Sequence, residues 1–357
     1  MFRRRQTGSE NLSDITTEAA KQQTRAASPA RDSRPWYSRL TQETIVLMLT
    51  VLLFIGFSLA LNNFFTTGNV ITLLRSVSVL GMLALGMAIT VIGRGVDLTM
   101  VATLVVGIVW ALKLHEAGFA FSTALMFGAC FAAVTGMVIG IIVAYAEIPA
   151  VFTTLAMGPV IFGFGNFAFF TEDTHNAPTD VTWLRDLGFE RFLGVPVSLY
   201  LFAVLAALVW AFLRFTRAGR SVYAIGDNML AARHTGFPVR PIIVSKYVLS
   251  ALIAFTVGLI VVATNSGINT RLVNTTLVYD VLLVVVLGGI GLSGGRGGVR
   301  NVIVGTLFVG VLLNGMTIMN LSYTTQNFIK SLVMLIALIA ETLLNPRDEQ
   351  TSQSGDI

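Results

Sequence analysis

Long apolar segments alternate with short polar or glycine-containing segments from residue 44 to residue 344. Most are near the ~20 residues with which a helix crosses ~30 Å of hydrocarbon at ~1.5 Å per residue. They lie at 44–62, 70–92, 97–113, 121–144, 150–170, 197–213, 241–263, 278–292, 301–319 and 326–344. A membrane barrel would instead show alternating segments of about ten residues. The pattern therefore predicts an all-α integral membrane protein with about ten transmembrane helices.

Composition agrees with this class and divides the chain into three parts. Hydrophobic residues make up 54% of the chain and charged residues 12%, whereas a soluble domain carries about 25% charged residues. Residues 1–43 form a polar, basic segment that we expect to be a disordered cytoplasmic tail. Residues 44–344 form the predicted transmembrane permease domain, and residues 345–357 form a second cytoplasmic tail. The basic residues concentrate in the first tail and in one loop, which indicates membrane topology rather than nucleic-acid binding.

The two longest internal loops carry opposite charge. Loop 171–196 contains five acidic residues against two arginines, and loop 214–240 contains five arginines against one aspartate. Cytoplasmic loops are enriched in Lys and Arg. We therefore expect loop 171–196 to be periplasmic and loop 214–240 to be cytoplasmic, with both termini in the cytoplasm.

Loop 214–240 contains the segment AIGDNMLAARHTGFP at 224–238. Asp227 or Asn228 is a preferred N-cap, Gly236 suits the position after a helix, and Pro238 prevents continuation. These signals predict a helix of about two turns. Since so short a helix is marginal in water by itself, it must dock either on lipid headgroups or on a cytoplasmic partner.

The segment VIGRGVDLT at 91–99 places Arg94 and Asp97 between two apolar segments. A charge at the bilayer centre costs ~2.5 to 3.5 kcal/mol, so the pair needs a structural reason. One interpretation is a solvated turn at the cytoplasmic face. The glycine-rich segment 288–298 likewise predicts a break or a tight turn, with Gly289 and Gly294 at its centre.

Four segments together resemble the ribose/xylose/autoinducer type of bacterial ABC sugar permease, within the branched-chain-permease-like superfamily. VIGRGVDLT is similar to that family's TGGIDLS signature, and IPAVFTTLAMG at 148–158 to its IPxFIVTLG segment. GRSVYAIGDNMLAARHTGF at 219–237 resembles GRxxYAIGGNxxAARLSGI, and VVLGGIGLSGGRGG at 285–298 resembles VVIGGTSLxGGRG. Two departures are Arg94, where glycine is usual, and Met229 with Leu230, where an acidic residue often follows the asparagine.

The resemblance implies a permease subunit with a type II ABC importer-like fold, which moves a monosaccharide or a related small polyol across the bacterial inner membrane. It implies three partners: a cytoplasmic ABC ATPase, a periplasmic sugar-binding protein, and a second permease chain that is either a copy or a paralogue. The residues implied to contact the ATPase are Asp227, Asn228, Ala231, Ala232, Arg233 and Gly236. The chain has no G-x-x-x-x-G-K-[ST] phosphate loop, so we expect ATP and Mg²⁺ to be used by the partner ATPase and no cofactor to be bound here.

The family signature also suggests a second interpretation of residues 91–99, which we favour. Gly93 and Gly95 would break the helix inside the membrane, Asp97 would cap the next segment, and Arg94 would be its countercharge. A sugar pathway needs sparse amide, hydroxyl and aromatic groups on apolar helices. In the fifth segment such candidates are Phe152, Thr153, Thr154, Asn166 and Phe169, although polar residues in membrane helices often bridge neighbouring helices instead.

Rival functions fit the sequence less well. An ion-coupled secondary transporter of small polar solutes, the main alternative, usually needs ionisable residues deep in several helices. This chain offers Arg94 and Asp97, with Lys246 and Lys330 near the ends of segments. A membrane enzyme would need a nucleophile beside a base or a metal cluster, and the three histidines fall in different loops. We therefore expect a transport subunit and not an enzyme.

Overall fold

The computed structural model describes residues 41–170 and 172–344. The chain divides after Thr41 into two units, and all elements below belong to the unit from Gln42 onward. The predicted tail 345–357 and residues 1–40 of the tail 1–43 lie outside the described residues.

Each of the ten predicted apolar segments forms a helix. They are α2 (Gln42–Ala60), α3 (Thr67–Ile92), α4 (Met100–Glu116), α5 (Phe121–Tyr145), α6 (Ala150–Ala168), α8 (Val197–Phe215), α11 (Val239–Asn265), α12 (Leu277–Leu287), α13 (Val299–Ile318) and α14 (Tyr323–Leu344). In the described part of the chain, eight helices are long and apolar enough to cross a membrane. The other two segments form α4, with 17 residues, and α12, with 11. The all-α membrane class is therefore confirmed, and one predicted span proves to be only about half as long as a membrane crossing.

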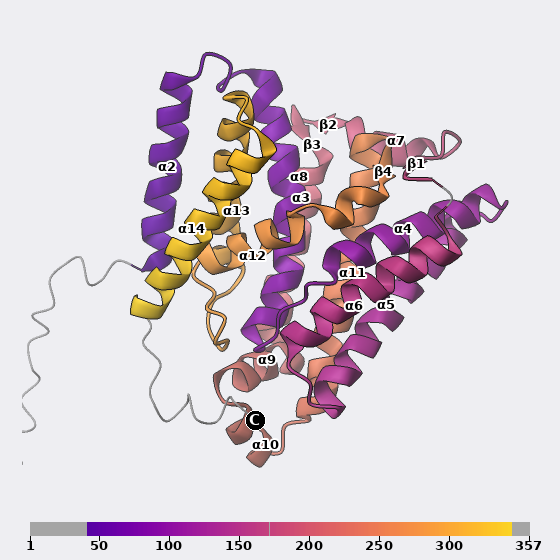
Figure 1. Cartoon of the computed structure of the whole chain (residues 1–357), viewed down its shortest axis with the longest axis vertical. Helices are drawn as coiled ribbons and strands as arrows, with labels where there is room; N and C mark the ends of the chain where they lie inside the picture. The colour runs from indigo at the N-terminus through magenta and orange to yellow at the C-terminus, as the bar shows by residue number, and fades with distance from the viewer. Residues whose placement is uncertain (1–40, 171, 345–357) are drawn as a thin grey trace, which may run out of the picture. The chain divides into compact units, whose positions relative to one another are not determined.

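Shorter elements lie at the two ends of this unit (Figure 1). One end carries α7 (Thr182–Phe189), β1 (Thr174–Asn176), β2 (Arg191–Phe192), β3 (Val195–Pro196), β4 (Gly267–Asn269) and the 3-10 helix Thr270–Asn274. The opposite end carries α9 (Arg217–Asp227) and α10 (Met229–His234). We call the first the external end and the second the cytoplasmic end, after the predicted positions of their loops. The sequence predicts only one of these short elements, the helix at 227–236, and none of the external ones.

Local sequence explains where several helices begin. Thr66 and Thr216 are the N-caps of α3 and α9, and their hydroxyls accept from the backbone amides of Asn69 and Gly219. Proline stands directly before α6, α8 and α11. The fixed φ of proline suits the entry into a helix. Proline lacks a backbone N–H, but a residue at the start of a helix has no partner in the helix for that group.

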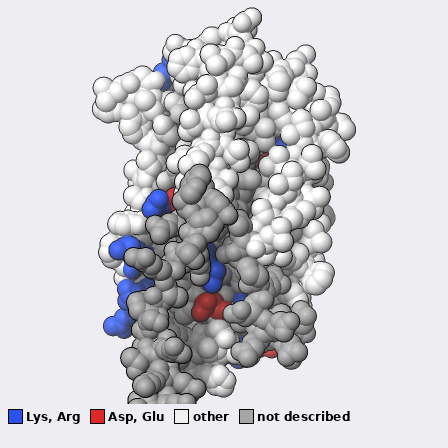
Figure 2. Space-filling view, turned by 90° about the vertical axis from the view of Figure 1, so that its left-hand side faces the viewer, with Lys and Arg blue, Asp and Glu red and all other residues white. Residues whose placement is uncertain are grey.

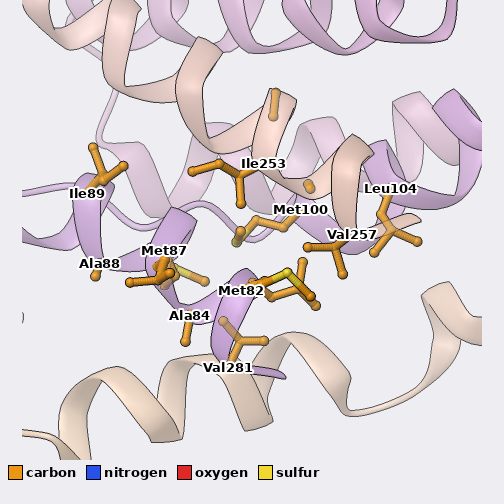
Figure 3. Close-up of a cluster of buried hydrophobic side chains, with 14 of the residues drawn as sticks. Met82, Ala84, Met87, Ala88, Ile89, Met100, Leu104, Ile253, Val257 and Val281 are labelled. Atoms are coloured by element: carbon orange, nitrogen blue, oxygen red, sulfur yellow. The ribbon is translucent and has the colours of Figure 1, made fainter. Parts of the chain in front are cut away.

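The core is built around α3, α4 and α11. Side chains from these helices interdigitate, among them Met82 and Met87 of α3, Leu104 of α4 and Val257 of α11 (Figure 3). Helix α5 packs closely against α11 at Gly136 and Gly140, which are four residues apart. A Cβ at either position would overlap the α11 backbone, so the absence of a side chain allows the close approach. By contrast, only 11% of the apolar stretch of α2 and of α14 is buried. The surface that includes these two helices is largely uncharged, and Lys and Arg gather toward its lower end (Figure 2).

Candidate functional site

The segment between α3 and α4 is a sharp break in the backbone. Helix α3 ends at Ile92 with Gly93 as its C-cap, and Arg94 adopts a left-handed φ of 57°. The amide of Gly95 donates to the carbonyl of Thr90 at 2.9 Å, which closes the turn. This conformation is uncommon for a residue with a side chain, so contacts around Arg94 must stabilise it.

Asp97 is buried inside this break, with 1% of its surface exposed. Its carboxylate accepts from the Thr99 amide at 3.0 Å, the Thr99 hydroxyl at 2.5 Å and the Ser250 hydroxyl at 2.7 Å. Helix α4 itself has Thr99 as its N-cap. The interpretation of Asp97 as an exposed turn residue is therefore wrong. Its bond to the Thr99 amide, just before α4, is the kind of hydrogen bond that a helix cap makes, as expected. The carboxylate also fastens the turn to α11.

Arg94 is not the countercharge of Asp97, contrary to expectation. Its Nε donates to the Ser293 carbonyl at 2.8 Å, and its guanidinium lies 3.4 Å from the Asp227 carbonyl. These two carbonyls belong to the glycine-rich segment 288–298 and to the end of α9. Arg94 thus joins three of the four motifs that carry the family resemblance.

A buried lysine of α11 also contacts the break. Lys246 is buried, donates through Nζ to the Gly93 carbonyl and lies 5.3 Å from the centre of the Tyr247 ring. A Cβ at Gly95 would overlap the Tyr247 hydroxyl, so glycine is required where α11 approaches the turn. The sequence predicts only that Lys246 lies near a helix end, because it is the tertiary fold that brings it to the break.

The glycine-rich segment 288–298 also packs against the end of α3. The amide of Gly295 donates to the carbonyl of Ile92, the last residue of α3, at 2.8 Å. Gly226 of α9 lies against both groups, and a Cβ there would overlap the Ile92 carbonyl and the Gly295 amide. The Tyr223 hydroxyl of α9 also donates to the Gly297 carbonyl at 2.8 Å. Burial raises the pKa of this phenol, which keeps it protonated and able to donate.

Segment 288–298 forms the turn predicted for it. Gly289 and Gly294 have φ values of 93° and 79°, in the region that favours glycine. The amide side chain of Asn301 donates to the Gly288 carbonyl at 2.7 Å and ties the turn to the start of α13.

The fifth segment reaches the break through Thr154. The Thr154 hydroxyl is fully buried and lies between the Ala150 carbonyl of its own helix, at 2.9 Å, and the Val96 carbonyl of the break, at 3.1 Å. Thr153 is also buried, but its hydroxyl donates to the Pro149 carbonyl, at the start of its own helix, at 3.3 Å. Phe152 and Asn166 are exposed on the surface of α6. The structure therefore does not bring Phe152, Thr153 and Asn166 together as one polar pathway.

The predicted docking helix is present as α10. Asn228 is its N-cap and accepts from the Ala231 amide at 2.9 Å, and Gly236 follows it with a φ of 80°. Ala232 is buried against the protein. The outward side is formed by exposed residues: Asp227, Leu230, Ala231, Arg233, Gly236 and Phe237. Leu230 and Phe237 give this exposed end an apolar component.

Arg233 also has a partner within the chain. Its guanidinium lies 3.2 Å from the Glu147 carboxylate, and that of Arg240 lies 3.7 Å from the same group. Glu147 stands between α5 and α6. The ion pair therefore tethers α10 to the α5–α6 connection, a contact that was not predicted from the sequence.

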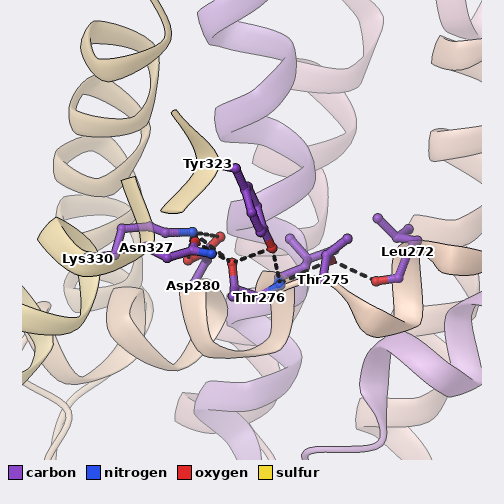
Figure 4. A network of polar contacts seen from close by, with 8 residues as sticks. Leu272, Thr275, Thr276, Asp280, Tyr323, Asn327 and Lys330 are labelled. Atoms are coloured by element: carbon purple, nitrogen blue, oxygen red, sulfur yellow. Dashed lines mark hydrogen bonds and ion pairs between the residues drawn. The ribbon is translucent and has the colours of Figure 1, made fainter. Parts of the chain in front are cut away.

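A second polar cluster lies between α12 and α14 (Figure 4). Lys330 Nζ lies 2.8 Å and 3.0 Å from the two carboxylate oxygens of Asp280, and it donates to the Thr276 hydroxyl at 2.8 Å. That hydroxyl donates to the Asn327 side chain at 3.2 Å, while the Tyr323 hydroxyl accepts from the Thr276 amide at 3.2 Å. The cluster borders a pocket of about 490 Å³. Asp280 was not among the predicted site residues, although it is a lone acid within an apolar helix.

The described residues show no group of three or more His, Cys, Asp or Glu side chains able to hold a metal ion. The site is thus a set of hydrogen-bonded helix connections at the cytoplasmic end, together with a charged pair toward the external end. Both consist of groups that hold and join helices.

Comparisons with known proteins agree with this architecture. A family model described as "Branched-chain amino acid transport system / permease component" matches residues 69–338. The ribose import permease protein RbsC of Escherichia coli is 33% identical over 318 residues, covering 85% of this chain and 94% of that protein. The L-arabinose ABC transporter permease protein AraH of Azospirillum brasilense is 28% identical over 314 residues, covering 88% and 91%.

The galactofuranose transporter permease protein YtfT of Escherichia coli is 29% identical over 278 residues, covering 77% of this chain and 80% of that protein. No solved structure matches the chain significantly. The family resemblance drawn from the four motifs is confirmed. The chain therefore belongs to this family of transport permease components and is a multi-pass protein of the bacterial inner membrane.

Proposed function

We propose that this chain is the permease subunit of an ATP-binding-cassette importer for a monosaccharide or a related small polyol. A separate ATPase, which uses ATP and Mg²⁺, docks on α10, and a periplasmic binding protein delivers the sugar. A second permease chain completes the pathway. The proposal rests mainly on one observation. Helix α9, the break at 93–99 and the turn at 288–298 pack against one another beside α10.

The exposed side of α10 supports docking on a protein rather than on lipid alone. Leu230 and Phe237 remain 48% and 42% exposed, next to Arg233 at the tip of a basic loop. A protein groove can bury the two apolar side chains and pair with the arginine. The names of the relatives support the class of substrate, since three of them are named for ribose, L-arabinose and galactofuranose.

Close backbone packing provides a route from α10 to the transmembrane helices. Asn228 separates α9 from α10, so a displacement of α10 pulls directly on α9. At Gly226, α9 contacts the last carbonyl of α3 and the turn before α13 without intervening side chains. Packed backbone transmits a displacement with little loss, because there is no flexible side chain to absorb it. Docking of the ATPase would thus move α3 and α13 together.

The test combines two exposed substitutions, Leu230→Asp and Ala231→Glu, with a control at Leu193→Asp. Leu193 is 84% exposed in the connection between β2 and β3, at the other end of the molecule. We expect the α10 variant to insert and fold normally but to retain about tenfold less ATPase on purification, and the control to match wild type. Normal ATPase retention and ATP-driven uptake by the α10 variant would reject the docking role.

An ion-coupled transporter remains the second candidate, because Asp280 and Lys330 form a charged pair within apolar helices. Proteoliposomes separate the two functions. Sugar uptake by the complex that requires ATP and survives collapse of the proton and sodium gradients supports the importer. Uptake that follows the ion gradient without ATP would replace it with the second candidate.

A further inference from the structure

The charged pair of α12 and α14 borders a pocket whose size and lining suit a small ligand. Its volume of about 490 Å³ falls within the range of ~300 to 1,000 Å³ found for small-molecule sites. The lining is mainly apolar with a few polar groups, which is the usual composition of such sites. Those groups are the hydroxyls of Thr276 and Ser331, the amide of Asn327, the pair Asp280–Lys330 and the ring of Tyr279.

The position of the pocket favours a ligand that arrives from outside. Helix α12 starts shortly after the external 3-10 helix, and Asp280 lies in its first turn. Lys330 is seven residues into α14, which corresponds to about 10 Å along the helix from its external end. The pocket therefore lies in the outer part of the predicted membrane thickness, below the surface that would receive the binding protein.

The charges of the pocket favour a neutral ligand. Both carboxylate oxygens of Asp280 lie within 3.0 Å of Lys330 Nζ, so the pair is neutral as a unit. A cation would have to displace the lysine, and an anion would face the carboxylate. Asp280 still has unused lone pairs, since a carboxylate offers about four acceptor positions. Ligand hydroxyl groups can donate to these lone pairs without breaking the pair.

Aromatic groups complete the match to a sugar ring. Tyr279 and Tyr323 are 50% and 57% exposed, and the Tyr279 ring borders the pocket. A tyrosine offers an apolar face to the C–H groups of a sugar ring and a hydroxyl to its oxygens.

We propose that the pocket between α12 and α14 binds a neutral polyhydroxylated ligand, a monosaccharide, as a station on the outer part of the translocation pathway. This inference rests on the proposed function and adds the place where the sugar contacts this chain. It assigns Asp280, Asn327, Ser331 and Tyr279 as contact residues, with Lys330 holding the Asp280 carboxylate in position.

A purely structural clamp between α12 and α14 is the competing explanation, and sugar protection of a thiol distinguishes the two. In a Cys130→Ser background, Ser331→Cys places a thiol on the pocket wall, and Leu332→Cys places one on the adjacent exposed residue outside the lining. The full transport complex in proteoliposomes is treated with a membrane-impermeant methanethiosulfonate, with or without excess D-ribose, L-arabinose or D-galactose. We expect the Ser331→Cys thiol to react and a transported sugar to slow that reaction about tenfold, while Leu332→Cys shows no protection.

A reversed pair, Asp280→Lys with Lys330→Asp, provides the second readout because it can still clamp the helices. We expect uptake to fall about tenfold while ATP hydrolysis stimulated by the binding protein persists. Uptake at the wild-type rate in the reversed pair, or no sugar protection at Ser331→Cys, would overturn the inference and leave the importer intact. If the reversed pair fails to fold, the protection experiment decides alone. A wild-type complex that imports no monosaccharide or small polyol would instead refute the proposed function.

Discussion

The carboxylate of Asp97 accepts a hydrogen bond from the hydroxyl of Ser250 at 2.7 Å, across 153 residues of sequence. Both residues are buried, so this bond fastens the break between α3 and α4 to the middle of the core helix α11. A buried polar group that loses its partner costs about 1 to 3 kcal/mol. The bond is therefore a structural link between a transport motif and the core.

We expect Asp97→Ala to lower the free energy of unfolding by about 2 to 4 kcal/mol, because it orphans both the Ser250 hydroxyl and the Thr99 amide. Thermal unfolding of the purified protein in detergent measures the loss. Ser250→Ala should be milder, and the double variant should show a coupling of about 1 kcal/mol or more. Ser245→Ala is a matched control on the same helix, since its hydroxyl bonds only within α11. Strict additivity of Asp97→Ala and Ser250→Ala would contradict the link.

Gly226→Ala tests the backbone contact between α9, α3 and the turn at 288–298. The added methyl would overlap two backbone groups that cannot rotate away, so we expect a loss of about 1 to 3 kcal/mol in the free energy of unfolding. Coupling of ATP hydrolysis to uptake should fall as well. Gly163→Ala in α6, where the methyl meets nothing within 4 Å, is the control and should be neutral or stabilising. A wild-type melting temperature for Gly226→Ala would show that the contact is looser than described.

Variants of the Arg233–Glu147 ion pair distinguish two roles of Arg233: tethering α10 to the rest of this chain and contacting the ATPase. Both side chains are about half exposed, and an exposed pair contributes about 0 to 1 kcal/mol. We therefore expect Glu147→Gln to leave the melting temperature nearly unchanged and ATPase binding intact. Arg233→Gln should be equally stable but should bind the ATPase more weakly. Equal losses of ATPase binding in both variants would mean that the arginine acts through its tether and not by direct contact.

A pH-sensitive contact joins the end of α4 to the loop 171–196 at the external end. His115, past the apolar part of α4, places Nδ1 2.9 Å from the Phe119 carbonyl and Nε2 3.1 Å from the Asp180 carboxylate. Only the protonated ring can donate to both, so the Phe119 carbonyl and then Asp180 raise the pKa of His115, and His115 lowers the pKa of Asp180. The histidine contribution is complete below about pH 6.5 and is lost as pH rises through its higher folded pKa. The aspartate contribution is present above about pH 4 and is lost in stronger acid.

We therefore expect wild type to melt at a higher temperature than His115→Gln near pH 5.5, and the difference to shrink by pH 8.5. Asp180→Asn should weaken the same pH dependence, since it removes the charged acceptor. The measurement is the melting temperature of each purified protein across this range. A difference that is constant with pH would exclude protonation of His115 as its source.

Several elements followed from local sequence. The ten apolar segments became ten helices, and the short helix α10 appeared between the predicted cap Asn228 and Gly236. The glycine turn at 288–298 also followed, because a left-handed backbone there favours residues without a Cβ. Each of these features depends on neighbours within a few residues. The external helix α7 was missed, since an eight-residue helix in a polar loop leaves no long apolar pattern.

The partners of the polar residues were not predictable in the same way. Arg94 was expected to neutralise Asp97 because the two are three residues apart, but its left-handed backbone directs it to the Ser293 and Asp227 carbonyls. Thr153 and Thr154 were both candidates, and only the rotation of α6 decides that Thr154 lies near the break. Asp280 was overlooked because its importance depends on Lys330, 50 residues away.

The sequence by itself determined the membrane class, the order of the helices, the family and the positions of the two glycine breaks, because apolar length and backbone freedom are local properties. Only the tertiary structure decided that four motifs meet in and around the break between α3 and α4, and that a charged pair borders a pocket between α12 and α14. The physical reason is that contacts between helices depend on how each helix is rotated and tilted against its neighbours. Those angles are set by packing over the whole core rather than by any one segment.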